Sequence, residues 1–153
     1  MSASADRAAI EAALPHRDPF LFVDRVADAG DGWIETTWRI PAGADWFRGH
    51  YPGRPVMPGV LICEHVFQSG ALLAARLLAG ETDRGGVPVL TKIDSARFRR
   101  IVAPGEELAT RVELADRAGP ALVMRGDVRC GSERVLRVGF TVTATGAVAA
   151  LDL

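Results

Sequence analysis

The sequence predicts an α+β fold in which an antiparallel sheet of about six strands wraps around one long central helix. The first observation is a run of helix-forming residues over 60–78 that is apolar around most of its circumference. The second is a series of runs after residue 100 in which apolar and polar residues alternate. A helix that is apolar on most sides must be surrounded, and strands with one wet face form a sheet covered on one side. The length of 153 residues suits a single domain over 1–153 with its own core.

The first elements of the chain are short. Residues 4–13 predict one helix, because helix formers dominate there and the Leu14-Pro15 pair would stop it. Residues 20–26 and 33–40 predict two strands joined by a turn-rich segment. A loop dense in proline and glycine follows over 41–59. This loop is long for a connection without its own structure, and such loops are often functional.

The central helix is expected over about 59–79, with Gly80 as its stop. The rest of the chain predicts four strands, of which the first, around 88–99, is indistinct apart from its β-branched residues. The other three show period-2 alternation, and their shared apolar faces consist of Leu108, Val112 and Leu114, then Leu122, Met124 and Val128, then Leu136, Val138, Phe140 and Val142. One buried helix wrapped by such strands is the hot-dog arrangement.

The composition is that of an ordinary globular protein, with 48% hydrophobic and 24% charged residues. A net charge of −1 gives no indication of nucleic-acid or membrane-surface binding. The two cysteines, Cys63 and Cys130, cannot form a disulfide framework, and the sequence has no Cys/His metal-ligand spacing. The N-terminus lacks the apolar core of a signal peptide, and polar residues interrupt the longest apolar stretch. We therefore expect a cytoplasmic protein without membrane insertion.

One ionisable residue, Glu64, lies within the apolar helix and needs an explanation. Its neighbours include Cys63 and Phe67, and burying a charge without a partner is costly. Gln68 follows four residues later, where its amide could hydrogen-bond and orient the carboxyl. A carboxyl in apolar surroundings keeps its proton more readily and is suited to donate it. An exposed helix glutamate is the alternative interpretation.

The loop before the helix carries His50, and imidazole is the commonest proton-transfer group near neutral pH. Gly59 falls near the helix start, where backbone N–H groups have no intrahelical partner and the dipole favours negative charge. Without a side chain, Gly59 would let a carbonyl oxygen approach closely, as an oxyanion-stabilising donor must. Each residue alone also fits an ordinary structural role. Together with Glu64 they supply a base, an acid and an oxyanion donor, the parts needed to remove a proton α to a thioester and expel a β-hydroxyl.

The chain resembles the β-hydroxyacyl-acyl carrier protein dehydratases of type II fatty-acid synthesis, the FabZ family, in three blocks that follow in order: LPHRDPFLFVDRV (14–26), GHYPGRPVMPGVLICE (49–64) and ARFRRIVAPGEEL (96–108). The resemblance implies a hot-dog fold, no metal or cofactor, and dehydration of (3R)-hydroxyacyl-carrier protein to the trans-2-enoyl product. It implies that His50 removes the α-proton, that Glu64 protonates the departing hydroxyl, and that the Gly59 N–H binds the thioester carbonyl. A single group doing both proton transfers in turn is the alternative.

The resemblance also implies an assembly. In the FabZ family the histidine and the carboxylate meet across a dimer interface, one from each subunit, and dimers assemble into hexamers. The expected partners are therefore an acyl carrier protein bearing a 3-hydroxyacyl chain and further copies of this chain. The related dehydratase/isomerase family, FabA, carries an aspartate at the position of Glu64. Glu64 thus favours a dehydratase without isomerase activity, although the carboxylate type alone does not settle isomerisation.

The central helix departs from the family pattern at His65 and Phe67, where small alanines are common. Phe67 could line the acyl tunnel and reshape it. His65 should point away from Glu64 on the helix and is not expected to act as a second catalytic histidine. His16 matches the family but is not its catalytic histidine, so we expect a structural role for it.

Three arginines, Arg97, Arg99 and Arg100, form a basic cluster that could receive an acidic carrier protein, with a solvated strand edge as the alternative. Two other functions stay open from the sequence. A hot-dog acyl thioesterase would need a carboxylate to activate water but no positioned histidine. A non-catalytic paralogue would bind acyl carrier protein and pair with an active copy, although a binding-only chain has no reason to keep an intact candidate site.

Overall fold

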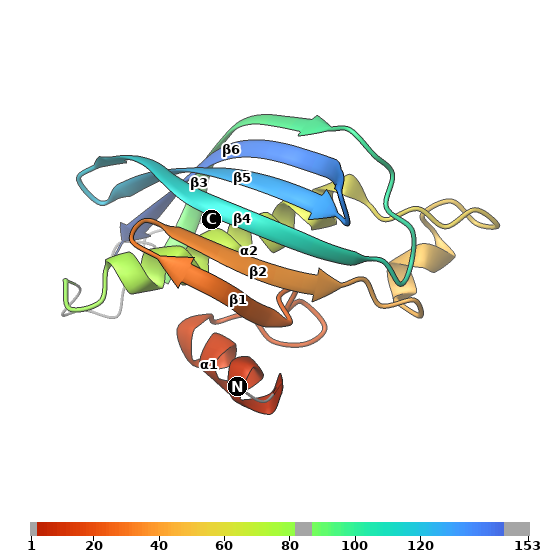
Figure 1. Ribbon diagram of the computed structural model, residues 1–153, viewed down its shortest axis with the longest axis horizontal. Coiled ribbons are helices and arrows are strands. Elements are labelled where there is room, and N and C mark those ends of the chain that lie inside the picture. The colour runs from red at the N-terminus through yellow and green to blue at the C-terminus, as the bar shows by residue number, and fades with distance from the viewer. Residues whose placement is uncertain (1–2, 82–86, 146–153) are drawn as a thin grey trace, which may run out of the picture.

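A six-stranded antiparallel sheet curls around the long helix α2 (Gly59–Leu77), while the shorter helix α1 (Ala3–Ala13) lies outside the sheet (Figure 1). The computed structural model describes residues 3–81 and 87–145. The strand order is β1-β2-β4-β5-β6-β3, with bounds β1 Arg25–Gly30, β2 Trp33–Arg39, β3 Val87–Phe98, β4 Glu107–Ala118, β5 Ala121–Cys130 and β6 Glu133–Thr145. This architecture confirms the predicted hot-dog fold.

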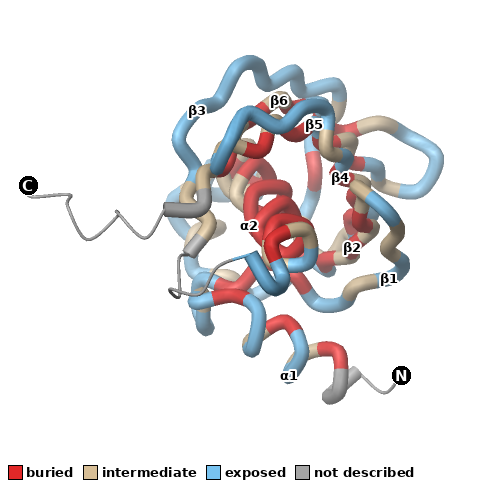
Figure 2. The backbone as a smooth tube through the Cα atoms, turned by 90° about the vertical axis from the view of Figure 1, so that its left-hand side faces the viewer, coloured by how far each residue is buried: buried red, intermediate tan, exposed pale blue. Residues whose placement is uncertain are grey.

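The core lies between the concave face of the sheet and α2, which Figure 2 shows buried at the centre of the molecule. Inward-facing residues alternate along β4, β5 and β6, as the period-2 pattern predicts. Two glycines let the helix approach the sheet closely. A Cβ atom at Gly126 of β5 would clash with Val66 of α2, and one at Gly70 would lie 2.6 Å from the ring of Phe140. Close packing therefore depends on small residues at these contacts.

By length and composition alone, the helix α2 is long and apolar enough to cross a membrane. However, most of the helix is buried inside the protein. The helix is apolar on most sides because the sheet covers one side of it and the segment before β1 covers another. The helix is thus a core element, in agreement with the interpretation of its interrupted apolar pattern.

The strand predicted over 20–26 is wrong for most of its length, because β1 begins only at Arg25. Leu21, Phe22 and Val23 are all buried in succession, so they do not alternate between a wet and a dry face. The backbone of Phe22 finds its partners in side chains of α2 instead of a neighbouring strand. Hydrophobic residues of strand type therefore form a buried loop here, whose backbone groups are satisfied by polar side chains.

The edge strand β3 carries large apolar side chains that face solvent in the protomer. Ile93 is 51% exposed and Phe98 is 48% exposed, and Ile101 just beyond the strand is also exposed. An exposed apolar edge strand is a template for pairing with another chain. The loop over 41–59 contains one short element, the 3-10 helix η1 (Asp45–Arg48), which leads directly to His50.

Candidate active site

Glu64 lies one turn into α2, where the side chain is 23% exposed although most of the helix is buried. Its Oε1 atom accepts a hydrogen bond of 3.0 Å from Nε2 of Gln68. The four-residue spacing places both side chains on the same face of the helix. The carboxyl is thus held by a neighbour on α2 while part of it stays accessible.

The orientation of the Gln68 amide is fixed by the segment before β1. The backbone N–H of Phe22 donates to Gln68 Oε1 at 2.8 Å, and Gln68 Nε2 donates to the carbonyl of Phe20 at 3.1 Å. Because the amide oxygen must face the Phe22 N–H, the amino group faces Glu64. Gln68 is completely buried, so the loop over 20–22 indirectly sets the position of the Glu64 carboxyl.

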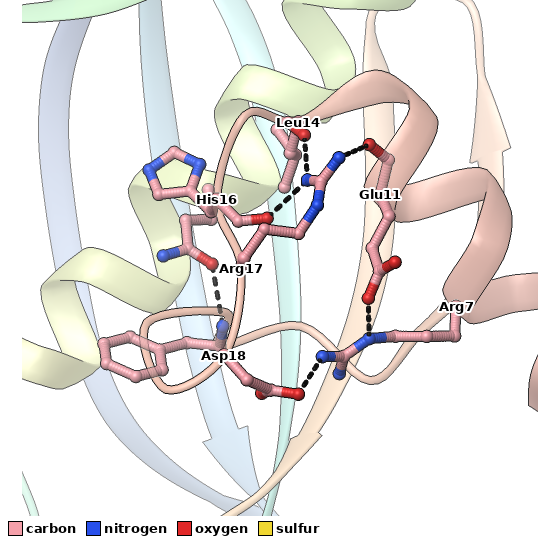
Figure 3. A network of polar contacts seen from close by, with 8 residues as sticks. Arg7, Glu11, Leu14, His16, Arg17 and Asp18 are labelled. Atoms are coloured by element: carbon pink, nitrogen blue, oxygen red, sulfur yellow. Dashed lines mark hydrogen bonds and ion pairs between the residues drawn. The ribbon is translucent and has the colours of Figure 1, made fainter.

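His16 also lies at this carboxyl, with its Nε2 atom 3.5 Å from Glu64 Oε1. Figure 3 shows His16 in the loop that follows α1, next to Arg17, whose guanidinium donates to several backbone carbonyls. The sequence predicts only a structural role for His16. The signal that could have pointed further is its place in the block over 14–26, one of the three that carry the family resemblance.

His50 is held in a defined tautomer by the loop. Its Nδ1 atom lies 2.6 Å from the carbonyl oxygen of Val56, and its backbone N–H donates to the carbonyl of Trp46 at 2.8 Å. A carbonyl only accepts, so Nδ1 carries the proton and Nε2 has a free lone pair. This is the state that a general base requires. Within the described part of one protomer, no hydrogen bond or ion pair joins His50 to Glu64.

Gly59 is the first residue of α2, so its backbone N–H has no acceptor within the helix. A Cβ atom there would lie 2.9 Å from the ring of Phe98, which comes from the end of the edge strand β3. The Phe98 ring therefore packs directly on the helix start, in the space that a side chain at residue 59 would need. Because this residue has no side chain, its free backbone donor can come close to a carbonyl oxygen.

Comparison with known proteins identifies the family of this chain. The family model described as the FabA-like domain matches residues 14–139. The 3-hydroxyacyl-[acyl-carrier-protein] dehydratase FabZ of Anaeromyxobacter sp. (strain Fw109-5) is 39% identical over 137 residues, covering 88% of this chain and 87% of that protein. The protein of the same name from Thioalkalivibrio sulfidiphilus (strain HL-EbGR7) is 46% identical over 136 residues, with coverages of 86% and 87%. The chain belongs to the FabZ family.

Solved structures support the fold of this FabZ-family chain. The dehydratase heterocomplex ApeI:P from Xenorhabdus doucetiae matches with a TM-score of 0.75 at 12% identity, covering 91% of this chain and 92% of that one. A hypothetical thioesterase from Streptococcus pneumoniae TIGR4, solved with coenzyme A, matches with a TM-score of 0.61 at 16% identity, with coverages of 80% and 88%. At these identities the likeness shows a shared fold alone.

His65, which departs from the FabZ pattern, is completely buried on the sheet side of α2. Its Nδ1 atom donates to the carbonyl of Phe22 at 2.6 Å, and its Nε2 atom accepts from the hydroxyl of Thr110 at 2.8 Å. Burial lowers the pKa of His65 to about 4, against a smaller opposing effect of the Phe22 carbonyl. His65 is therefore a neutral structural residue at neutral pH, and it points away from Glu64 as the helix geometry predicts.

Phe67 is buried and packs edge-to-face on Phe140 of β6, with ring centroids 5.0 Å apart. This places it in the core between helix and sheet. The same Phe140 ring packs against the backbone at Gly70. Its suggested role in the acyl tunnel stays a prediction.

The three arginines of the predicted basic cluster, Arg97, Arg99 and Arg100, have different surroundings in the structure. Arg100 is engaged by Glu106 through two hydrogen bonds of 2.7 and 2.8 Å and also pairs with Glu133. Its hydrogen bonds lower the pKa of Glu106 to about 2. Arg97 instead pairs across the sheet with Arg137 of β6 in the strand register. Arg100 is thus committed to an intramolecular ion-pair network, while Arg97 and Arg99 are exposed.

Proposed function

We propose that this FabZ-family chain, as one hot-dog domain over 1–153, is a (3R)-hydroxyacyl-acyl carrier protein dehydratase of fatty-acid or related acyl-chain synthesis. It eliminates water to give the trans-2-enoyl thioester. The observation that carries the proposal is the Glu64 carboxyl, fixed by Gln68 and partly accessible on an otherwise buried apolar helix. The curated relatives named as dehydratases support the same activity. The cytoplasm is the compartment we expect.

In the proposed reaction, Nε2 of His50 accepts the α-proton of the 3-hydroxyacyl thioester. The electron pair of the broken Cα–H bond forms the Cα–Cβ double bond, and the Cβ–O bond breaks. Glu64 gives its proton to the departing hydroxyl, which leaves as water. The Gly59 N–H stabilises the negative charge that develops on the thioester oxygen. These proton transfers require no metal or cofactor.

We propose that the site is shared between two subunits. His50 and Glu64 are not in contact within the described protomer, whereas the edge strand β3 offers exposed apolar residues for pairing with a second copy. Phe98 at the end of that strand lies beside Gly59, so the edge is continuous with the site. Pairing of two β3 edges would let His50 of one subunit serve Glu64 of the other. The hexamer implied by the family stays a prediction.

The activity is tested by incubating the purified protein with (3R)-hydroxyacyl carrier proteins of several chain lengths, followed by mass spectrometry of the intact carrier. We expect the loss of one water from the acyl group, because elimination changes nothing else. A (3S)-hydroxyacyl carrier protein is the matched control and should stay unchanged. Release of free acid and unloaded carrier would instead indicate a thioesterase, and unchanged substrate at every chain length would overturn the proposal.

The two alternatives are not favoured. A thioesterase needs no histidine with a free Nε2 lone pair, which the Val56 carbonyl enforces at His50. A non-catalytic paralogue needs neither the oriented carboxyl nor a free backbone N–H at Gly59. The curated relatives that cover most of this chain carry the dehydratase name.

A further inference from the structure

We infer that His16 is a positioning residue that, together with Gln68, holds the Oε1 atom of Glu64 and so reserves Oε2 for the substrate hydroxyl. The inference rests on the proposed dehydratase function. Oε1 lies 3.0 Å from Gln68 Nε2 and 3.5 Å from His16 Nε2. Both nitrogens thus approach the same carboxyl oxygen from different elements of the chain.

The tautomer of the neutral His16 ring follows from its surroundings. Its Nδ1 atom is buried and has no hydrogen-bond partner among the described residues. A proton on Nδ1 would be a buried donor without an acceptor, which is costly. The proton therefore resides on Nε2, which faces the Glu64 carboxyl. At 3.5 Å this contact lies at the outer limit of hydrogen bonding, so its effect is mainly electrostatic orientation.

The loop that carries His16 is fastened to the end of α1 (Figure 3). Nη1 of Arg17 donates to the carbonyls of Leu14 and His16 at 2.7 and 2.6 Å, and Nη2 donates to the carbonyl of Glu11 at 2.9 Å. The ring of His16 also stacks near Phe20, with an interplanar angle of 23°. These contacts hold the imidazole against α2 and give α1 a part in the site.

Arg7 adds a second tie between α1 and the same loop. Its guanidinium donates to the carboxylates of Glu11 and Asp18, each at 2.7 Å (Figure 3). Asp18 follows His16 by two residues, so the loop is attached on both sides of the imidazole. A flexible loop would not keep Nε2 at a constant place, and positioning requires such support.

The chemical consequence concerns the proton that Glu64 donates. Two N–H groups facing Oε1 stabilise the carboxylate that remains after proton transfer. Because Oε1 is occupied by these donors, the acidic proton resides on Oε2. That proton passes from Oε2 to the β-hydroxyl, whose bond to Cβ breaks, and water leaves. The two donors therefore determine which oxygen meets the substrate.

The test compares His16→Phe with His16→Gln in the full chain, using a 3-hydroxyacyl carrier protein substrate. Phenylalanine keeps a ring against Phe20 but removes the N–H, whereas glutamine can place an amide N–H near the position of Nε2. We expect His16→Phe to lower kcat about threefold to tenfold, because a contact of 3.5 Å is worth no more than an ordinary hydrogen bond. KM should change little, and His16→Gln should recover most of kcat. Thermal unfolding of each variant serves as the folding control, and His16→Leu replaces the phenylalanine variant if that one does not fold.

Wild-type kcat in the folded His16→Phe variant would overturn the inference, and so would equal losses in the phenylalanine and glutamine variants. A loss confined to KM would also contradict it, because a positioning residue for proton transfer acts on kcat. An inactive wild-type protein would be a different result. It would remove the proposed function, and the inference that rests on it would fall as well.

Discussion

Replacing Glu64 by glutamine is expected to lower kcat for dehydration by a factor of about 10²–10⁴, the usual contribution of a positioned proton-transfer group. Glutamine is nearly isosteric and can still contact Gln68, but it has no acidic proton to give to the departing hydroxyl. The measurement is steady-state turnover of a 3-hydroxyacyl carrier protein. Glu107→Gln, on an exposed glutamate at the start of β4, is the matched control and should keep wild-type turnover.

His50→Ala is expected to cause a loss of the same order, since the α-proton then has no base. The double variant His50→Ala/Glu64→Gln should be little worse than either single one, because residues that act as a unit are not additive. Circular dichroism must show a native fold for each variant. Retention of most activity by Glu64→Gln would refute its role as the acid, and retention by His50→Ala would refute the base.

Acidification is expected to destabilise the protein between about pH 6.5 and pH 4 through His65. The folded-state pKa of about 4 lies below the ordinary value of 6.5, because burial opposes the charged imidazolium. Between about pH 6.5 and pH 4, His65 is therefore protonated in the unfolded chain but stays neutral in the folded chain. The His65 contribution is complete above about pH 6.5 and is lost as the pH falls toward 4, for a total of roughly 3 kcal/mol in the free energy of unfolding.

Urea unfolding at several pH values and one fixed protein concentration measures this effect. His65→Gln is the test variant, because its amide can donate and accept hydrogen bonds but does not titrate. Its free energy of unfolding should lose most of the pH dependence between 6.5 and 4. His50→Gln, in a partly exposed loop, is the control and should keep it. An unchanged slope in His65→Gln would contradict the assignment. The carboxyl of Glu106, whose pKa is about 2, loses its contribution only below about pH 4.5 and does not overlap most of this window.

The parts of the fold that could be predicted from the sequence are those governed by local periodicity. The alternation along β4 to β6 and the apolar circumference of α2 define the helix and the sheet around it. The segment over 20–26 could not be assigned correctly, because its backbone is satisfied by Gln68 and His65, which lie more than forty residues away. A strand-like composition does not reveal that its partners are side chains.

Some contacts of the candidate site could likewise be predicted from local spacing, and others could not. The contact between Gln68 and Glu64 follows from helical spacing and could be predicted. The approach of His16 to the same carboxyl depends on how the loop after α1 folds back onto α2, and no periodicity encodes it. The separation of Arg100 from Arg97 depends on Glu106 and on strand register, which are equally non-local.

The most direct test of the shared dehydratase site is to mix two inactive variants, His50→Ala and Glu64→Gln, and allow their subunits to exchange. A mixed dimer would contain one site with both substitutions and one site with neither. Random exchange at equal concentrations should therefore restore about a quarter of the wild-type dehydratase activity. Absence of any recovery, with mixed dimers demonstrated by native mass spectrometry, would contradict a site in which His50 of one subunit serves Glu64 of the other.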